Sequence, residues 1–304
     1  MEIKHLKRFL AIYEYGSLSA AAKELGLTQQ ALSSSISKLE DEIELTLFDR
    51  APGGITKPTQ YGRALVRHAR SQISSINRAA EELHAIRDAK SGTITIGVGE
   101  SFAGDIMASA VSRLHNMRPE IRINLIEGYS EKLLEKLLEG ELDFLAGDIG
   151  GLYTGNDLKQ ELCFTSNDVV YCRPEHPLVG KSNLTLKDLQ GYTWITPYSR
   201  PSDLKAINDA FIAENLEPPK SIIGSDAVMV GMKLLENNDF LIMTSPGLIG
   251  KKPEKGENIL VTVDIDRPTV LRHAYLIYHA DRPMSPIGSL LMQEVKDACE
   301  VFGK

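Results

Sequence analysis

Six apolar residues recur at nearly heptad spacing between residues 65 and 83, and this repeat constrains the fold more than any other feature. The steps between them are 4, 4, 3, 4 and 3 residues, so they form one stripe on a single long helix. A helix of roughly 28 residues spans about 42 Å, which is too long to be buried in one small domain. The stripe therefore predicts a partner helix, and with it a homodimer. Its members are Leu65, Ala69, Ile73, Ile76, Ala80 and Leu83.

Three shorter helical segments precede this repeat. The first has an apolar stripe at helical spacing and stops at Gly16. Ser17 or Ser19 is placed to cap the second helix, and Thr28 is placed to cap the third. In the third helix the apolar residues fall at steps of 4, 3 and 4, which predicts one buried face. That face consists of Leu32, Ile36, Leu39 and Ile43.

The opposite face of the third helix carries amides, hydroxyls and a single lysine. Amides and hydroxyls can meet base edges in the major groove, and a lysine can meet a phosphate. This pattern predicts a helix-turn-helix whose third helix reads DNA. The alternative is the solvated face of an ordinary three-helix bundle. The predicted DNA-contacting residues on this helix are Thr28, Gln29, Gln30, Ser33, Ser34, Ser37 and Lys38.

The next segment, LTLFDRAPGGITKPT, alternates apolar residues around a central Pro-Gly-Gly and predicts a short β-hairpin. A hairpin directly after a reading helix is a wing, which favours DNA binding over the bundle. Arg50 and Lys57 are expected to contact phosphate or to enter the minor groove.

From residue 92 strand patterns alternate with helix patterns, which predicts an α/β body with parallel sheets. In such folds ligands bind beyond the carboxyl ends of strands, where helices begin. Several hydroxyl-bearing helix starts and one arginine predict a site for a small organic anion. The alternative is that each serine only caps a helix. The expected effector-binding residues are Ser101, Phe102, Gly128, Ser130, Arg200, Ser202 and Ser225.

The sequence lacks the usual signatures of enzymes and cofactor sites. In GVGESFAG, Phe102 stands where a dinucleotide site needs its third glycine. The sequence lacks a G-x-S-x-G elbow, a P-loop and zinc-ligand spacing. We therefore predict no enzyme, no cofactor and no metal. Cys163 and Cys172 are expected to pack as small hydrophobes on strands, with a redox pair of these two as the alternative.

The net charge of −7 is unevenly divided along the chain. Residues 1–90 hold 13 Lys and Arg against 11 Asp and Glu, whereas the remaining 214 residues hold 21 against 30. This asymmetry suits a DNA-facing head on an acidic body. No apolar run is long enough to span a membrane, and the first run contains charges unlike a signal peptide. We expect no membrane association and a cytoplasmic protein.

The segments GSLSAAAKELGLTQQALSSSISKLEDEI, LFDR and ITKPTQYG together resemble the N-terminus of the LysR-type transcriptional regulators. The resemblance implies a winged helix-turn-helix over residues 1–58 and a dimerising linker helix over 59–90. It further implies a periplasmic-binding-protein-like sensor over 91–304, with subdomain I at 91–163 and 268–304 and subdomain II at 164–267.

The same resemblance implies inverted-repeat promoter sites on double-stranded DNA, a small-molecule effector between the subdomains, and a homotetramer. This sequence departs from the family at Ser34 and Ser35, where Gln, Arg or His is common, and at Gly53-Gly54, where the wing is usually basic. It also lacks the glycine pair that usually precedes the strand within LENNDFLIMTS. These departures concern base preference and the shape of the ligand pocket.

Overall fold

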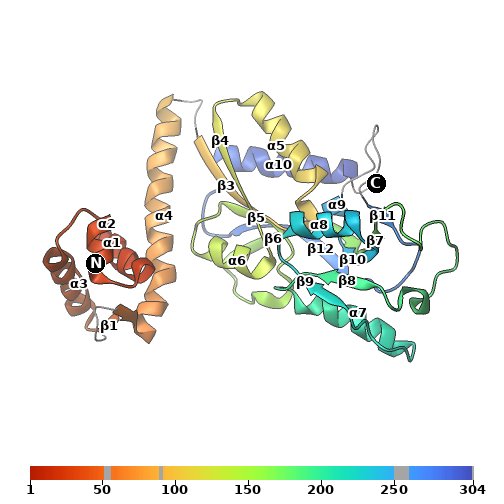
Figure 1. Cartoon of the computed structure of the whole chain (residues 1–304). Helices are drawn as coiled ribbons and strands as arrows, with labels where there is room; N and C mark the ends of the chain where they lie inside the picture. Colours follow the sequence, from red (N-terminus) through yellow and green to blue (C-terminus); the bar gives the residue numbers. More distant parts are fainter. Residues whose placement is uncertain (51–55, 89–91, 250–259, 303–304) are drawn as a thin grey trace. The chain divides into compact units, whose positions relative to one another are not determined.

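The computed structural model describes residues 1–50, 56–88, 92–249 and 260–302, without the side chains of residues 50, 78, 81–88 and 302. The chain divides into two compact units, whose elements are labelled in Figure 1. Gly53-Gly54 and the predicted boundary at residues 90 and 91 lie outside the described residues. Unit 1 comprises Met1–Thr95, Glu120–Arg122 and Glu135–Asp143, and unit 2 comprises Ile96–Pro119, Ile123–Leu134 and Phe144–Lys304.

Unit 1 begins with three helices, α1 (Ile3–Tyr15), α2 (Leu18–Glu24) and α3 (Gln29–Ile43). Gly16 ends α1 in the left-handed conformation, with a φ of 62° that suits glycine. Ser17, and not Ser19, caps α2, because its side chain accepts a hydrogen bond from the Ala20 backbone. Thr28 caps α3 as predicted, accepting from the Ala31 N–H at 3.2 Å.

The predicted apolar face of α3 is confirmed as part of one core. Leu32, Ile36 and Leu39 are buried, and Ile43 is partly buried against the same cluster. Phe9 of α1 is fully buried among them, and its ring lies 5.3 Å from that of Phe48. The helical spacing of the sequence thus becomes the packing of α1 against α3.

The predicted hairpin is present as β1 (Phe48–Arg50) and β2 (Thr56–Pro58), paired antiparallel. The N–H of Thr56 donates to the carbonyl of Gly16 at 2.9 Å, which attaches the hairpin to the turn after α1. The long helix α4 (Gln60–Asp88) follows.

The apolar stripe of α4 is used in two ways. Ala69 is fully buried, and Leu65 and Ile73 pack against the core of the chain's own head. Ile76 is 41% exposed and Ala80 is exposed. The first half of the predicted apolar stripe is therefore buried within the head, because α1 packs on it. The exposed part of the stripe begins at Ile76.

Two five-stranded sheets form the body. Sheet I has the order β4-β3-β5-β12-β6, and sheet II has the order β11-β7-β10-β8-β9. The strands of sheet I are β3 (Gly92–Val98), β4 (Ile121–Glu127), β5 (Phe144–Gly147), β6 (Leu158–Asn167) and β12 (Leu271–His279). Those of sheet II are β7 (Val169–Cys172), β8 (Thr193–Thr196), β9 (Ile222–Gly224), β10 (Phe240–Thr244) and β11 (Val261–Thr262).

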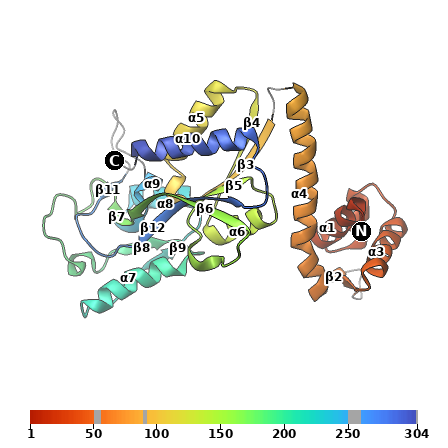
Figure 2. The same ribbon diagram turned by 180° about the vertical axis from the view of Figure 1, so that it is seen from behind.

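Helices cover both sheets. Helices α5 (Asp105–Met117) and α10 (Pro286–Phe302) lie side by side in both views (Figures 1 and 2). On sheet II, Trp194 packs in a cluster with α7 (Pro201–Ala213), whereas Ile195 packs in another with α8 (Val228–Asn237). Successive strand residues face opposite sides, so α7 and α8 cover opposite faces.

The sheets are mixed, which corrects the prediction of parallel sheets. The pairs β3/β5, β8/β10 and β8/β9 are parallel. Strand β12 is antiparallel to β5 and β6, and β7 is antiparallel to β10 and β11. The chain builds all of sheet II between β6 and β12, so these two strands are not joined by the short helical crossover that makes neighbouring strands parallel.

The chain passes from sheet I to sheet II at Asp168, between β6 and β7, and returns before β12. The two crossing segments are bonded to each other. The Asp168 N–H donates to the Val270 carbonyl at 2.8 Å, and the Thr269 hydroxyl donates to the Asp168 carbonyl at 2.7 Å. Of the crossing points expected from the resemblance, Pro268 directly precedes Thr269, whereas Phe164 lies within β6 of sheet I, four residues before Asp168.

The remaining short elements connect strands to helices. Among the described residues, none of the helices is long and apolar enough to cross a membrane. These elements are η1 (Glu100–Phe102), α6 (Ser130–Leu138), η2 (Gly150–Leu152), η3 (Leu186–Leu189) and α9 (Pro246–Ile249).

Candidate functional site

Helix α3 presents the predicted polar face to solvent. Gln29, Gln30, Ser34 and Lys38 are exposed, and Ser33 and Ser37 are partly exposed. Thr28 is exposed and already uses its hydroxyl to cap the helix. The structure thus gathers amide, hydroxyl and ammonium groups on one accessible helix face.

Ser35 belongs to the interior and not to this face. Its side chain is buried with 4% exposure, and its hydroxyl accepts a hydrogen bond from Arg8 Nη1 at 2.8 Å. Ser35 falls between Leu32 and Leu39 on the helix, so the periodicity that buries them buries it too. Of the two serines that depart from the family pattern, only Ser34 is accessible.

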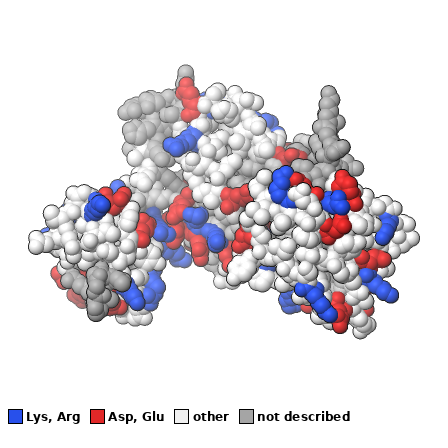
Figure 3. Space-filling view, in the orientation of Figure 1, with Lys and Arg blue, Asp and Glu red and all other residues white. Residues whose placement is uncertain are grey.

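The hairpin carries one cation among its described side chains. Lys57 of β2 is exposed and pairs in register with Asp49 of β1. The side chain of Arg50 lies outside the described residues. On the face drawn in Figure 3 acidic and basic side chains are intermixed, and most of the surface is uncharged.

A polar cavity of about 350 Å³ opens in unit 2 where strands end and helices begin. Gly99 follows β3 and Asp148 follows β5, and both line it. Helix α6 starts in this cavity at Ser130, and α7 starts at Pro201, directly after Arg200. Five of the predicted effector residues line the cavity: Ser101, Gly128, Ser130, Arg200 and Ser202.

A more apolar cavity of about 390 Å³ shares part of this wall. Glu100, Gly128 and Tyr129 line both cavities. Ser225, another predicted residue, lines the apolar one beside the start of α8. Glu127, Thr196, Asp226 and Thr244 also line it. Most of its other lining side chains are apolar, among them Ile195, Val228, Met229, Met232, Ile242, Met243 and Leu248.

The arginine of the cleft already has carboxylate partners. Arg200 Nη2 lies 2.5 Å from Glu100 Oε2, and Arg200 Nη1 lies 3.3 Å from Asp203 Oδ2. The second oxygen of Glu100 accepts a hydrogen bond from the Thr244 hydroxyl. The side chains of Arg200 and Glu100 are only 19% and 15% exposed, so water screens this pair weakly.

A second arginine extends the network to the crossing between sheets. Arg272 lies 2.6 Å from Asp168 Oδ2 and 2.7 Å from Asp203 Oδ1. The other oxygen of Asp168 is buried and has no hydrogen-bond partner among the described residues. Burial raises the pKa of Asp168 to about 6, although the hydrogen bond and charge of Arg272 act against the rise.

Tyr129 completes the wall between the cavities. The Arg200 guanidinium lies over its ring, 5.1 Å from the ring centre. Burial, and then the charge of Glu100, raises the pKa of Tyr129 to about 12. Its hydroxyl is therefore neutral at physiological pH and can donate a hydrogen bond.

Several predicted hydroxyls already have partners inside the protein. Ser130 donates to the Asp148 carbonyl, Ser202 donates to Asp203, and Ser225 accepts from the Ala227 N–H. Phe102 does not line either cavity: its side chain is fully buried, and its ring packs 5.5 Å from that of Phe164. We therefore exclude Phe102 from the candidate ligand contacts.

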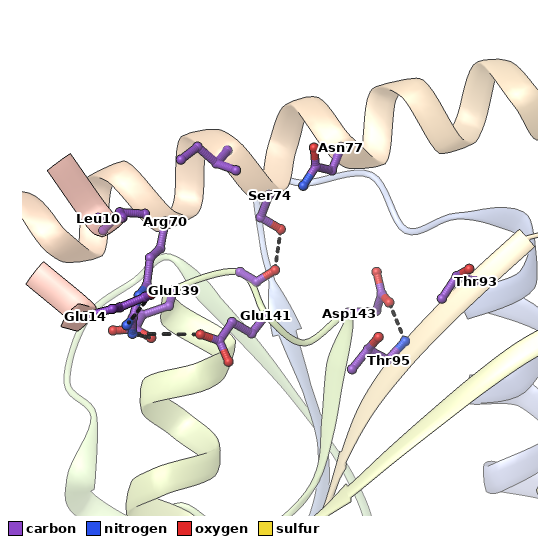
Figure 4. Close-up of a pocket in the computed structure, with 12 residues that line it drawn as sticks. Leu10, Glu14, Arg70, Ser74, Asn77, Thr93, Thr95, Glu139, Glu141 and Asp143 are labelled. Carbon is purple, nitrogen blue, oxygen red and sulfur yellow. Dashed lines mark hydrogen bonds and ion pairs between the residues drawn. The ribbon is translucent and has the colours of Figure 1, made fainter. Parts of the chain in front are cut away.

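Unit 1 contains a further cavity of about 390 Å³, drawn in Figure 4. Arg70 of α4 points into it and contacts Glu139 at 2.6 Å and Glu14 of α1 at 3.3 Å. The Ser74 hydroxyl donates to the Gly140 carbonyl. The ion pairs in this cavity join α4 to α1 and to residues 139–141, which gives Arg70 a structural role that the sequence did not indicate.

Two family models match the chain. The LysR substrate binding domain matches residues 87–300. The bacterial regulatory helix-turn-helix protein, lysR family, matches residues 3–63. The chain belongs to the LysR family.

Curated relatives agree with this assignment. The regulator GbpR of Azospirillum brasilense is 28% identical and is matched over 94% of this chain and 83% of its own length. The SDS degradation transcriptional activation protein of a Pseudomonas strain is 27% identical, over 97% and 96%. Among solved structures, full-length CbnR complexed with its target DNA has a TM-score of 0.69 at 17% identity, over 98% of this chain and 100% of that one.

This LysR-type protein is thus a transcription regulator with a helix-turn-helix and a substrate-binding domain, and not an enzyme, as the sequence predicted. The fold prediction, a winged helix-turn-helix followed by an α/β sensor, is confirmed in the same way.

Sequence reasoning missed several residues of the regulator's cleft. Glu100, Asp168, Asp203 and Arg272 form the charge network around Arg200. Asp203 is only three residues from Arg200, on the first turn of α7, whereas the other three lie far from Arg200 in the chain. The available signal was weak: Glu100 lies inside GVGESFAG, next to the predicted Ser101. Only the fold shows that its carboxylate reaches Arg200.

Proposed function

We propose that this regulator reads inverted-repeat promoter DNA with α3 and the β1–β2 wing, and changes its DNA binding when a small organic anion enters the cleft of unit 2. The exposed amide and hydroxyl face of a capped α3, adjoining a wing, is the observation that carries the proposal.

The DNA contacts divide by chemistry. Gln29, Gln30 and Ser34 are accessible and offer donors and acceptors to base edges. Ser33 and Ser37 flank them, with smaller exposure. Lys38, Lys57 and Arg50 are assigned to the phosphate backbone, which fixes the position of the head on the duplex.

We propose a homodimer formed through the second half of α4. Ile76 and Ala80 continue the apolar stripe beyond the part covered by the head, and both are exposed. Two such helices would bury them in a shared seam and place two heads for two half-sites. A homotetramer and a cytoplasmic location, where a DNA-reading regulator meets its DNA, belong to the same proposal.

The ligand is proposed to act by exchange at Arg200. An incoming carboxylate takes the place of Glu100 on the guanidinium, next to Ser101 and the starts of α6 and α7. The apolar part of the ligand then lies in the adjoining cavity that Ser225 lines. Helix N-termini and hydroxyls favour an anion at this position.

Ligand binding is proposed to alter the relation of sheets I and II about the crossing at Asp168 and Val270. These segments are joined by backbone hydrogen bonds and adjoin the Arg272–Asp168–Asp203 network. A ligand shifts an equilibrium only as far as its affinities for the two states differ. The change in the sensor would then reset the spacing of two heads on DNA.

The test is capture and sequencing of genomic fragments by the full-length protein at near-physiological salt. Wild type should enrich a few sites that contain an inverted repeat. A Gln29→Ala, Gln30→Ala variant should lose that enrichment, whereas the control Gln72→Ala, an exposed glutamine on α4, should keep it. Uniform, salt-sensitive retention by all three proteins would contradict sequence-specific reading by α3.

The dimer has its own test. Ile76→Asp places a charge in the proposed seam, so it should shift sedimentation toward the monomer and weaken site binding. The matched control Ser75→Asp, at an exposed position of α4 away from the apolar stripe, should leave both unchanged. Unchanged sedimentation of Ile76→Asp would remove this face of α4 as the dimer contact.

A further inference from the structure

The three cysteines have different surroundings. Cys172 at the end of β7 is fully buried, and burial raises its pKa to about 12. Cys163 of β6 and Cys299 of α10 instead line one cavity of about 450 Å³. The Cys163 thiol donates to the Glu161 carbonyl at 3.9 Å, and the Cys299 thiol is close enough to interact with Cys163. The structure therefore pairs Cys163 with Cys299, and not with Cys172, the partner considered from sequence.

The backbone is irregular at Cys163. Along the antiparallel pair of β6 and β12, Phe164 faces Ala274 and Leu162 faces Tyr275. Cys163 between them faces no residue and is thus the extra residue of a β-bulge. A bulge redirects a side chain from the regular alternation of a strand. Here it places the sulfur of an edge-strand cysteine against α10.

The cavity also holds a fixed ammonium group. Lys296 of α10 lines it, with its Nζ 2.5 Å from Glu161 Oε2. Tyr278 donates a hydrogen bond to the other oxygen of Glu161. The lysine is thus held beside the cysteines by a partner that is itself hydrogen-bonded.

These contacts distinguish the two thiols. The interaction with Cys299 lowers the pKa of Cys163, and the charge of Lys296 and the Leu276 amide lower it further, whereas burial and Glu161 oppose them. The pKa of Cys299 is raised, because it interacts with Cys163 and because it is buried. Cys163 is the nucleophile of the pair, and Cys299 is the thiol that remains protonated.

We propose that Cys163 and Cys299 form a two-cysteine site that reacts with a hydroperoxide and closes to a disulfide between β6 and α10. The Cys163 thiolate attacks the outer peroxide oxygen, the O–O bond breaks, and the leaving oxygen takes a proton to give water or an alcohol. Cys163 is now a sulfenic acid. The Cys299 sulfur then attacks the Cys163 sulfur and releases water. Two thiols lose two electrons, and the peroxide gains them.

The site is separate from the effector cleft and is linked to it by one ring contact. Phe164 follows Cys163, and its ring packs on Phe102, which follows Ser101 of the cleft. A disulfide would tie α10 to the edge of sheet I directly beside this contact. Oxidation would thereby change the conformation of the sensor domain without a bound effector.

The test exposes the reduced full-length protein to hydrogen peroxide, blocks free thiols, and maps the peptides by mass spectrometry. We expect a Cys163–Cys299 disulfide, with Cys172 remaining a free thiol. Peroxide should consume Cys163 roughly tenfold faster in the folded protein than in the protein unfolded in urea, where the contacts that lower its pKa are lost. Equal rates in the two states would overturn the proposal.

Variants separate the two steps. In Cys299→Ser, Cys163 should stop at the sulfenic acid and be labelled by dimedone, whereas Cys163→Ser should give neither label nor disulfide. Lys296→Met should move the midpoint of the rate against pH upward, which loss of packing alone would not do. Cys172→Ser is the control and should react as wild type. Oxidation of Cys163 to sulfinic acid in wild type, without the disulfide, would refute the pairing.

Discussion

Replacement of Glu100 by glutamine tests whether an anion enters the cleft by exchange at Arg200. In the wild-type protein the ligand must separate the pair at 2.5 Å before it binds the guanidinium. Unit charges about 4 Å apart attract by roughly 4 kcal/mol at an effective dielectric constant of about 20, and this is an upper bound. Desolvation of the freed Arg200 offsets part of this attraction. We therefore expect the anion to bind Glu100→Gln with a free energy about 1.5–3 kcal/mol more favourable than it binds wild type. That corresponds to a dissociation constant roughly tenfold to a hundredfold lower.

The assay is isothermal titration with three probes that share an apolar body and differ in charge: hexanoate, hexanol and hexylammonium. Glu100→Gln should bind hexanoate more tightly, hexanol unchanged and hexylammonium more weakly. Glu131→Gln is the matched control, because Glu131 lines the same cavity and has no contact with Arg200 among those described. If hexanoate binds both variants more tightly by the same factor, the gain comes from the less negative net charge of the protein, and the exchange at Arg200 is refuted. If hexanoate does not bind Glu100→Gln, the exchange is refuted as well.

Three further predictions follow from the same contacts. Ser35→Ala removes the acceptor of Arg8 and should lower the free energy of unfolding in urea by about 1–2 kcal/mol without changing the preferred DNA site. Ser34→Ala should change the preferred DNA site and leave the free energy of unfolding unchanged. Lys57→Ala should flatten the slope of log affinity against log salt by about 0.9 per lost phosphate contact, hence by about 2 if two heads bind; an unchanged slope excludes the contact. The raised pKa of Asp168, about 6, means that its proton stabilises the fold as pH falls from 7 to 5, by about 1 kcal/mol; Asp168→Asn should abolish that part of the pH dependence of unfolding, and an identical profile would contradict the shift.

Local patterns predicted the three N-terminal helices and the wing of unit 1 well, because each of these elements is set by neighbours in the sequence. Thr28 caps α3 through a residue three positions away, and Gly16 ends α1 by its own conformation. Leu32 and Leu39 mark the buried face, and the same spacing implies that Ser35 is interior. The predicted wing follows from alternation around a turn, and both of its strands are present.

The cleft was predictable only in part, because its chemistry depends on contacts between distant segments. Helix starts pointed to Ser130 and Arg200, and both line the cavity. No local pattern indicates that Glu100 neutralises Arg200, or that Cys163 meets Cys299. Phe102 was misplaced for a related reason: its position beside Ser101 suggested the cleft, but its ring turns into the core against Phe164.

The charge of the reading head bears on how the regulator can be controlled. Helix α3 offers amides and hydroxyls with one accessible lysine on the face proposed for DNA, so a single head gains little from phosphate contacts. In the proposed homodimer, specific binding would then depend on both heads meeting their half-sites together, since a linked second head binds at a high effective concentration only when the geometry fits. If the sensor changes the separation of two weak heads, as proposed, affinity changes steeply and α3 itself need not change.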